Sequence, residues 1–385
     1  MRPFFLLFLL LSCQVKQEAT QNIKTTSGNI INGTKLSREE SDLARAGVAL
    51  FYGNSSCSGI LVSRNVILSA GHCFPSDGLD TSKVKVYLGS ESPAAGNKGT
   101  QYQVEKVIIH PDYIKTQVDA DLAVIVLKDN VSNNYEAMDL YDSNDYLEVA
   151  DPLVIAGFSP FSKPVRKSVY DVFTEKYRYD YQNTNSENRF PFKKIKNLLS
   201  RKAIVMSDKL MGRNTQDAIF MTQLAGGICS GDSGGPTMTQ RGDRHYLVGI
   251  NRAVQFANKL KGSDCEFISI STSVRFYKSW INETVRNNNG LQITWTNPKE
   301  EVNQRDKECA NTLTLSFDIY YGLANPTPDF CQQLSYIDIA QELKDMNEAC
   351  EQTCSNLKGF EGQCSFLSRG NADMIKLNQD LCQAL

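Results

Sequence analysis

Short runs of alternating apolar and polar residues fill the stretch 30–288. The clearest are "SGILVSRNVILSA", "VKVYLGS", "QVEKVIIH", "LAVIVL" and "LVGI", and Gly, Asn, Asp and Ser separate them. Short strands divided by turn residues at this spacing are typical of a β-barrel or a β-sandwich. We therefore predict an all-β domain for this part of the chain.

Two later stretches repeat their apolar residues at helical spacing instead. The first closes the β-rich region and places four side chains on one face of a predicted helix: Val274, Tyr277, Ile281 and Val285. The second predicts a helix near the C-terminus through Ile339, Leu343, Met346, Cys350 and Cys354, with Ser335 as its expected N-cap.

The N-terminus reads as an export signal, because one Arg precedes an apolar run over 4–11 that is too short to span a bilayer. The run ends in "LLSC", which resembles the lipobox of bacterial lipoproteins, where the cysteine becomes the lipidated first residue, here Cys13. The alternative is an ordinary cleaved signal that happens to contain Cys13. We predict a signal peptide over 1–12 and a tether or propeptide over 13–29. The expected location is secreted, or periplasmic or outer-membrane with a lipid anchor in the membrane.

Cysteine counting agrees with export. The chain has eleven cysteines, and removing Cys13 leaves an even number that disulfides can pair completely. Six of them lie between Cys309 and Cys382. We predict a small disulfide-rich α-helical domain over 309–385, joined by a linker over 289–308, and leave its disulfide pairing open.

Composition excludes several classes of protein. The chain of 385 residues is 41% hydrophobic and 22% charged, with a net charge of −2, so it carries no global nucleic-acid footprint. Its three histidines are too few for a His-rich metal site. We expect no metal, no cofactor and no nucleic-acid partner.

Charge is nevertheless unevenly distributed. The segment 161–202 holds eleven Lys or Arg against four Asp or Glu, a net charge of +7. It is either a decorated surface loop or an exosite for an anionic partner. The region 301–385 holds thirteen acidic against six basic residues, a net charge of −7, which suggests docking of one segment on the other.

The candidate chemistry begins with "CSGDSGGP" over 229–236, which contains Ser233. A serine hydroxyl needs an adjacent base, and the base needs a third group that orients it. His72 in "LSAGHCF" follows an apolar run, and a disulfide between Cys57 and Cys73 would fix the backbone beside it. Asp121 precedes the fully apolar "LAVIVL", where a buried carboxylate requires a partner.

The motifs "LSAGHCF", "DADLAVIVL" and "GDSGGP", in this order, resemble the chymotrypsin/trypsin family of serine endopeptidases over 30–288. "IING", "HPDY", "IAGF", "YLVGI" and "YKSWI" add to the resemblance. It implies two six-stranded antiparallel β-barrels with a C-terminal helix, a monomer, and protein or peptide substrates. The competing interpretation is a catalytically silent binding protein on a protease-like scaffold.

The resemblance also implies a role for each residue. Ser233 would attack the scissile carbonyl, His72 would take and return the proton, and Asp121 would orient His72. The backbone N–H groups of Gly231 and Ser233 would form the oxyanion hole.

Activation and specificity follow the same resemblance. Cleavage before Ile30 would free an ammonium that pairs with Asp232 and so activates a precursor. Gly227 stands where a tryptic enzyme has Asp, so we expect non-tryptic specificity for small to medium uncharged side chains. A disulfide between Cys229 and Cys265 would brace the pocket. Further expected pocket and edge residues are Asn251, Arg252, Ala253 and Ser269, with Arg252 a candidate to favour acidic substrate residues.

Overall fold

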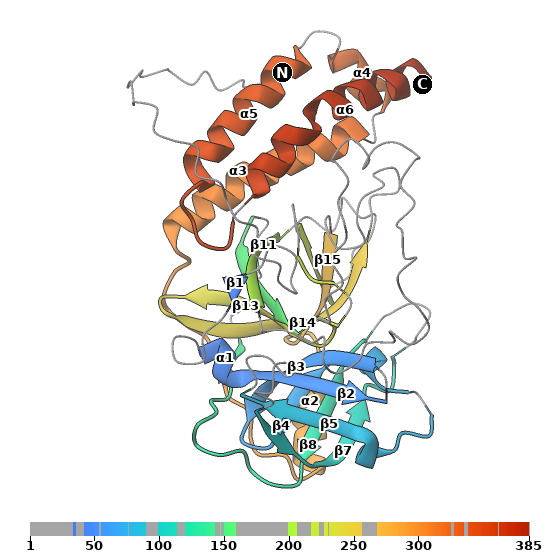
Figure 1. Cartoon of the computed structure of the whole chain (residues 1–385), viewed down its shortest axis with the longest axis vertical. Coiled ribbons are helices and arrows are strands. Elements are labelled where there is room, and N and C mark those ends of the chain that lie inside the picture. The colour runs from blue at the N-terminus through green and yellow to red at the C-terminus, as the bar shows by residue number, and fades with distance from the viewer. Residues whose placement is uncertain are drawn as a thin grey trace.

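A computed structural model places two β-sheets and a group of C-terminal helices in three stacked layers (Figure 1). It describes residues 34–35, 42–53, 55–75, 77–89, 99–113, 120–142, 147, 150–158, 199–205, 217–222, 227–229, 231–255, 268–324, 327–334, 338–360 and 362–384. The predicted signal and tether and nearly all of the basic segment 161–202 lie outside these residues. So do Cys13, Ile30 and Cys265.

The first sheet has seven strands in the order β6-β5-β2-β3-β4-β8-β7. They are β2 (Gly47–Tyr52), β3 (Ser55–Ser63), β4 (Val66–Ser69), β5 (Val84–Leu88), β6 (Thr100–Tyr102), β7 (Val104–Ile109) and β8 (Ala123–Leu127). Only Gln103 separates β6 from β7, so one run of chain pairs with β5 and then with β8. The sheet therefore curls around a core that buries all of β8.

The second sheet has nine strands. They are β1 (Thr34–Lys35), β9 (Leu140–Tyr141), β10 (Pro152–Gly157), β11 (Leu199–Val205), β12 (Ala218–Thr222), β13 (Pro236–Arg241), β14 (Arg244–Gln255), β15 (Ile268–Ser273) and β16 (Trp295–Thr296). The pairings β13-β10-β11-β12-β15-β14 close into a ring through β13–β14. The total exceeds the expected six because β1 and β9 pair with this ring from outside and β16 pairs with β9.

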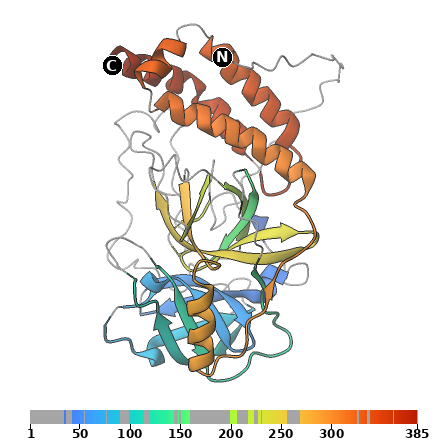
Figure 2. The ribbon, with the colours of Figure 1, turned by 180° about the vertical axis from the view of Figure 1, so that it is seen from behind.

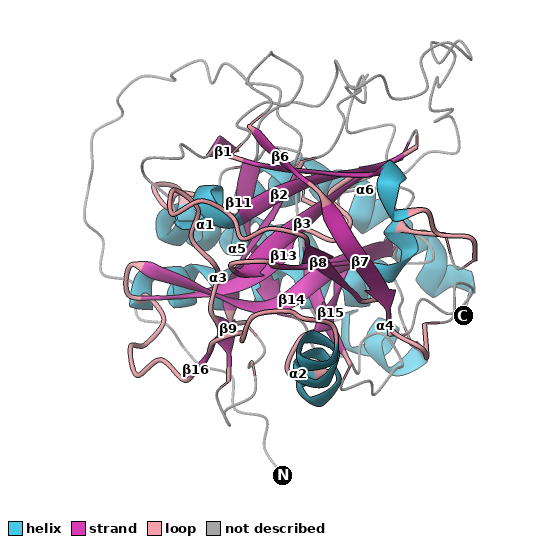
Figure 3. Cartoon of the chain, turned by 90° about the horizontal axis from the view of Figure 1, so that it is seen from below, coloured by secondary structure: helices cyan, strands magenta, loops and turns pink. Residues whose placement is uncertain are grey.

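The helices are α1 (Asp42–Ala46), α2 (Lys278–Asn287), α3 (Gln304–Ala324), α4 (Pro328–Leu334), α5 (Ile339–Cys354) and α6 (Gln363–Ala384). Short 3₁₀ helices occupy η1 (Gly71–Cys73) and η2 (Thr81–Lys83). Seen from below, the strands lie in front of the C-terminal helices (Figure 3). Within the described residues, no helix is long and apolar enough to cross a membrane.

Helix α2 packs against the first sheet, as the view from behind shows (Figure 2). Ile281 and Val285 are buried in the core of that sheet together with Val274 and Tyr277. The apolar face predicted from their spacing is therefore confirmed.

Helix α5 confirms the second apolar pattern but begins differently from the prediction. Leu343, Cys350 and Cys354 are buried. The N-cap is Asp338, whose carboxylate accepts the backbone N–H groups of Ala340 and Gln341 at 3.1 Å. Asp is a preferred N-cap because its side chain satisfies these otherwise unpaired donors. The residue predicted for this role, Ser335, lies outside the described part of the chain.

Three disulfides fasten the C-terminal helices to one another. Cys309–Cys354 joins α3 to α5, Cys331–Cys382 joins α4 to α6, and Cys350–Cys364 joins α5 to α6. Cross-links stabilise a small helical unit because they restrict its unfolded chain.

The C-terminal helices share a core with the second sheet. One continuous apolar cluster joins residues of α3 and α5 to residues of β12, β15 and the chain just before β10: Ala150, Phe220, Ile268 and Ile270 on the sheet side, with Cys309, Ala310, Leu313 and Phe317 on α3. Lys307 also pairs with Asp151 at 2.5 Å. The helices are thus packed on the β-domain.

The stretch expected to be a linker, 289–308, is packed as well. Ile293 is only 4% exposed and belongs to the core of the first sheet. Trp295 and Thr296 form β16, which pairs with β9, and α3 already begins at Gln304. The chain reaches the helices along the surface of the β-domain, because these contacts hold it there.

We predict that Leu313→Ala lowers the free energy of unfolding by about 2–5 kcal/mol, because it opens a cavity in the shared cluster. Leu313 is fully buried. Leu315, on the same helix, is 60% exposed, so Leu315→Ala should change stability by less than about 0.5 kcal/mol. Chemical denaturation followed by circular dichroism measures both. Equal effects of the two substitutions would show that the helices do not share this core.

Candidate active site

His72 and Asp121 come together because the strands that precede and follow them are paired. Ser69 of β4 pairs with Ala123 of β8, and η1 carries His72 just beyond that pair. Asp121 lies two residues before Ala123, at a turn where the N–H of Leu122 donates to the carbonyl of Ala120. Both residues therefore meet at the same end of the sheet.

The carboxylate of Asp121 is fully buried and accepts two hydrogen bonds from one residue. The backbone N–H of His72 donates to Oδ1 at 2.8 Å, and Nδ1 lies 2.6 Å from Oδ2. A carboxylate can only accept, so the geometry assigns the proton to Nδ1 and leaves Nε2 as an acceptor. The side chain of His72 is 29% exposed, which keeps its ring accessible.

Asp121 also connects the two sheets. The hydroxyl of Thr272, on β15, donates to the backbone carbonyl of Asp121 at 3.1 Å. The buried acid therefore stands at the junction between the sheets, where the residues on either side can reach it.

The backbone of Ser233 is held near Cys73, the neighbour of His72, through a disulfide and a hydrogen bond. Cys73 follows His72 and is bonded to Cys57, as predicted. Ser58 follows Cys57, and its N–H donates to the carbonyl of Ser233 at 2.7 Å. The same carbonyl oxygen lies 3.8 Å from the sulfur of Cys73. Residues distant in sequence are thus gathered at one point.

The turn that carries Ser233 requires glycine at the next position. Gly234 has φ of +80°, a left-handed conformation that side chains disfavour. A Cβ there would lie 2.1 Å from the hydroxyl of Ser69 and 2.4 Å from the carbonyl of Ser58. Glycine therefore lets the nucleophile turn approach the first sheet closely.

The buried hydroxyl of Ser58 was not found by sequence reasoning. It donates to the carbonyl of Gly231 at 3.0 Å and accepts the N–H of Phe158 at 2.8 Å. The only sequence signal was a small polar residue directly after a disulfide cysteine in an apolar strand. Ser58 thus bonds β3 to the turn before Ser233 and to the end of β10.

Asp232, predicted to receive an activating ammonium, is fully buried. Its Oδ2 accepts the N–H of Cys229 at 2.9 Å. Gly157 makes room for it, since a Cβ there would lie 2.3 Å from Oδ1. Ile30, its expected partner, lies outside the described residues.

Comparison with known proteins agrees with this geometry. The family model "Trypsin" matches residues 30–281. The chain belongs to the trypsin family. A similar relative is chymotrypsin-like elastase family member 1 of Macaca fascicularis, which is 23% identical over 70% of this chain and 94% of its own length. Tissue-type plasminogen activators of Sus scrofa and Bos taurus are 24% and 25% identical over 60% of the chain, which spans only 39% of their length.

Two residues expected at the substrate-binding edge are instead turned inward. Asn251 is fully buried and its side-chain amide bonds within the second sheet, to the carbonyl of Ala156 at 2.9 Å. The side chain of Arg252 is 3% exposed and lies 3.5 Å from the carboxylate of Asp217. A guanidinium that is buried beside an internal carboxylate is poorly placed to attract an acidic substrate residue.

The other expected pocket residues are neutral. Gly227 has no side chain, and Ala253 is half-buried on β14. The buried hydroxyl of Ser269 has no hydrogen-bond partner within the described part of the chain. Cys229 is disulfide-bonded, whereas its predicted partner Cys265 is not among the described residues.

The remaining histidines lie elsewhere. His245 binds Asp42 through Nδ1 at 2.8 Å and its backbone N–H at 3.0 Å, which fastens α1 to β14. Burial alone would raise the pKa of the Asp42 carboxyl, but the hydrogen bonds and charge of His245 outweigh burial and hold this pKa below its usual value. His110 packs between Tyr277 and Trp280, and burial lowers its pKa.

Two groups of residues have metal-ligating atoms close together in the described part of the chain: Cys57, His72 and Cys73, and Cys350, Cys354 and Cys364. Every cysteine in both groups is in a disulfide, so its sulfur is not available as a thiolate ligand. Neither group is suited to hold a metal ion in this oxidised form.

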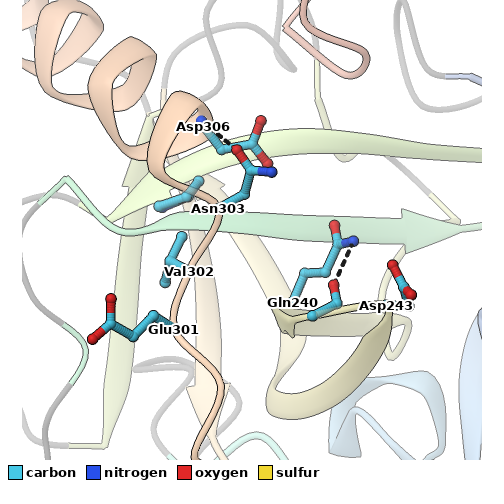
Figure 4. Close-up of a pocket in the computed structure, with 8 residues that line it drawn as sticks. Gln240, Asp243, Glu301, Val302, Asn303 and Asp306 are labelled. Atoms are coloured by element: carbon cyan, nitrogen blue, oxygen red, sulfur yellow. Dashed lines mark hydrogen bonds between the residues drawn. The ribbon is translucent and has the colours of Figure 1, made fainter.

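A separate pocket lies between the β13–β14 hairpin and the start of α3 (Figure 4). Its lining includes the carboxylates of Asp243, Glu301 and Asp306. Asn303 caps α3 there, since its side chain accepts the N–H of Arg305 at 3.0 Å. None of the predicted triad residues borders it, so this pocket is distinct from the candidate active site.

We predict that Ser58→Ala lowers the free energy of unfolding by about 1–3 kcal/mol, because it leaves the carbonyl of Gly231 and the N–H of Phe158 without their buried partner. Ser55→Ala, on the same strand at an exposed position, serves as the control and should change stability by less than about 0.5 kcal/mol. Urea denaturation of both variants measures this. Indistinguishable midpoints for Ser58→Ala and wild type would contradict the bridging role.

Proposed function

We propose that this chain is a serine endopeptidase that hydrolyses peptide bonds through an acyl-enzyme. The observation that carries the proposal is the fully buried carboxylate of Asp121. Its Oδ1 lies 2.8 Å from the backbone nitrogen of His72 and its Oδ2 lies 2.6 Å from Nδ1, which holds this histidine beside the turn of Ser233. Membership of the trypsin family supports the same chemistry.

In the proposed mechanism, the hydroxyl of Ser233 attacks the carbonyl carbon while Nε2 of His72 takes its proton. Asp121 stabilises the imidazolium that forms. The N–H groups of Gly231 and Ser233 receive the oxyanion of the tetrahedral intermediate. The intermediate collapses, and His72 returns the proton to the leaving amine. Water then attacks the acyl-enzyme, while His72 takes a proton from the water and returns it to the oxygen of Ser233.

We propose that the enzyme is made as a precursor and activated by cleavage before Ile30. The new ammonium would pair with Asp232, which is fully buried and directly precedes Ser233. Such a pair would order the turn that carries Gly231 and Ser233. Asn29 precedes the cleavage site, so the activating protease is not expected to be tryptic.

The proposed primary specificity is for small to medium uncharged side chains. Gly227 offers no carboxylate to a basic side chain, and Ser269 offers only a neutral hydroxyl. The internal pairing of Arg252 with Asp217 argues against recognition of acidic residues.

We propose that the protein is exported and that lipid on Cys13 anchors it to a membrane, as the "LLSC" sequence indicates. Stable anchoring needs more than one acyl chain. The charge of −7 on 301–385 and of +7 on 161–202 further suggests that these regions interact.

A fluorophosphonate probe tests the activity directly. We expect it to label the full mature chain, with Ser233→Ala unlabelled and the labelled chains starting at Ile30. The reason is that only an activated serine reacts with such a probe. Labelling absent from chains that already start at Ile30 would contradict the proposal and favour the silent binding protein. Labelling absent from chains that extend upstream would identify an unactivated precursor.

A peptide library read by mass spectrometry tests the specificity. We expect cleavage after small to medium uncharged residues, because Gly227 and Ser269 carry no charge and the guanidinium of Arg252 pairs internally with Asp217. The Ser233→Ala chain is the control and should leave the library uncut. Cleavage confined to sites after Lys or Arg would show that the pocket assignment is wrong.

A further inference from the structure

Asn251 touches the nucleophile turn through both its backbone and its side chain. Its backbone N–H donates to the carbonyl of Gly235 at 2.8 Å, and its carbonyl accepts the N–H of Gly234 at 2.8 Å. Its Nδ2 donates to the carbonyl of Asp232 at 3.2 Å. One residue of β14 therefore holds the three positions that surround Ser233.

The orientation of this amide is fixed by its other partners. Nδ2 also donates to the carbonyl of Ala156 on β10 at 2.9 Å. Oδ1 accepts the hydroxyl of Thr237 at 2.8 Å, and Thr237 in turn lies 2.6 Å from the hydroxyl of Ser271. The same network favours this amide orientation, because a flipped amide would face two carbonyls with its oxygen.

The carbonyl that Asn251 holds belongs to the same peptide unit as the N–H of Ser233. A trans peptide is planar, so its C=O and N–H groups point in opposite directions. Fixing the carbonyl of Asp232 toward the interior of the second sheet therefore turns the N–H of Ser233 away from that interior. In the proposed mechanism, this N–H of Ser233 donates a hydrogen bond to the oxyanion.

The N–H of Gly235 also donates to the carbonyl of Asp232, at 3.0 Å. Gly235 is part of the same turn and would move with it. Asn251 is anchored outside the turn, through Ala156 and Thr237, so it supplies the fixed reference. Asn251 and Asp232 are both fully buried, which keeps water from replacing the hydrogen bond between Nδ2 of Asn251 and the carbonyl of Asp232.

We propose that Asn251 is a positioning residue of the oxyanion hole, which holds the Asp232–Ser233 peptide so that the N–H of Ser233 faces the reacting carbonyl. This inference rests on the proposed peptidase function. It differs from the role expected for Asn251 as part of the substrate-binding edge.

The test compares Asn251→Ala and the similarly shaped Asn251→Asp with the control Asn65→Ala in the full activated chain. Asn65 is a matched buried amide in the turn between β3 and β4, 8% exposed, whose Nδ2 donates to the carbonyl of Asn289 and whose Oδ1 accepts the N–H of Leu291. It has no contact with the nucleophile turn among the bonds described. Steady-state kinetics on a chromogenic peptide and inhibition by a peptide aldehyde are measured for each chain.

We expect kcat to fall on the order of tenfold to a hundredfold in both Asn251 variants, since one oxyanion donor is misdirected rather than removed. KM should change by less than about threefold, and the aldehyde, which forms an oxyanion on binding, should weaken by the same factor as kcat. The pH midpoint of kcat/KM should stay unchanged, because the His72–Asp121 pair is untouched. Asn65→Ala should retain wild-type kcat.

Wild-type kcat in the Asn251 variants, whatever their thermal stability, would overturn the inference. So would equal losses in Asn65→Ala, or a shifted pH midpoint, because either would indicate general disruption. An inactive wild-type chain would instead overturn the proposed function and the catalytic role with it. In that case hydrogen exchange of 229–235 still tests whether Asn251 holds the turn, independently of catalysis. Unchanged protection in Asn251→Ala would show that it does not.

Discussion

The buried carboxylate of Asp121 is the constraint on which the arrangement of the site depends. A charge without access to water must be compensated by donors that the protein fixes in place. His72 supplies two such donors. This requires η1 to follow β4 at the end of the sheet where β8 begins. The hydroxyl of Thr272 brings the second sheet to the same point. The buried acid thus lies where the two sheets meet.

A second regularity concerns the carbonyls of the nucleophile turn. Those of Gly231, Asp232 and Ser233 all face donors at the junction of the sheets, from Ser58 and Asn251. Because each peptide is planar, the N–H groups of the following residues point the other way. The orientation of the turn is therefore set by the hydrogen bonds that its buried carbonyl groups accept from Ser58 and Asn251.

Sequence patterns correctly predicted features that depend on residues close together in the sequence. The spacing around Ile281 gave a correct helical face, and the partnership of Cys57 with Cys73 followed from their position around a strand pair. The inward direction of Asn251 and the pairing of Arg252 with Asp217 were missed. A side chain's direction at these positions depends on partners that are far away in sequence, such as Ala156 and Thr237, so no local pattern reveals it.

The shared apolar cluster gives the C-terminal helices a physical connection to the site. Phe220 and Ile270 lie in that cluster on β12 and β15, and Ser269 and Ser271 alternate with Ile270 along β15. Successive side chains of a strand face opposite sides, so the helices pack on one side of β15 while its other side meets Asn251 and the expected pocket. Loss of the helices would expose the apolar side of this strand to water. We therefore expect the register of β15, and with it the support of the nucleophile turn, to depend on the helical region.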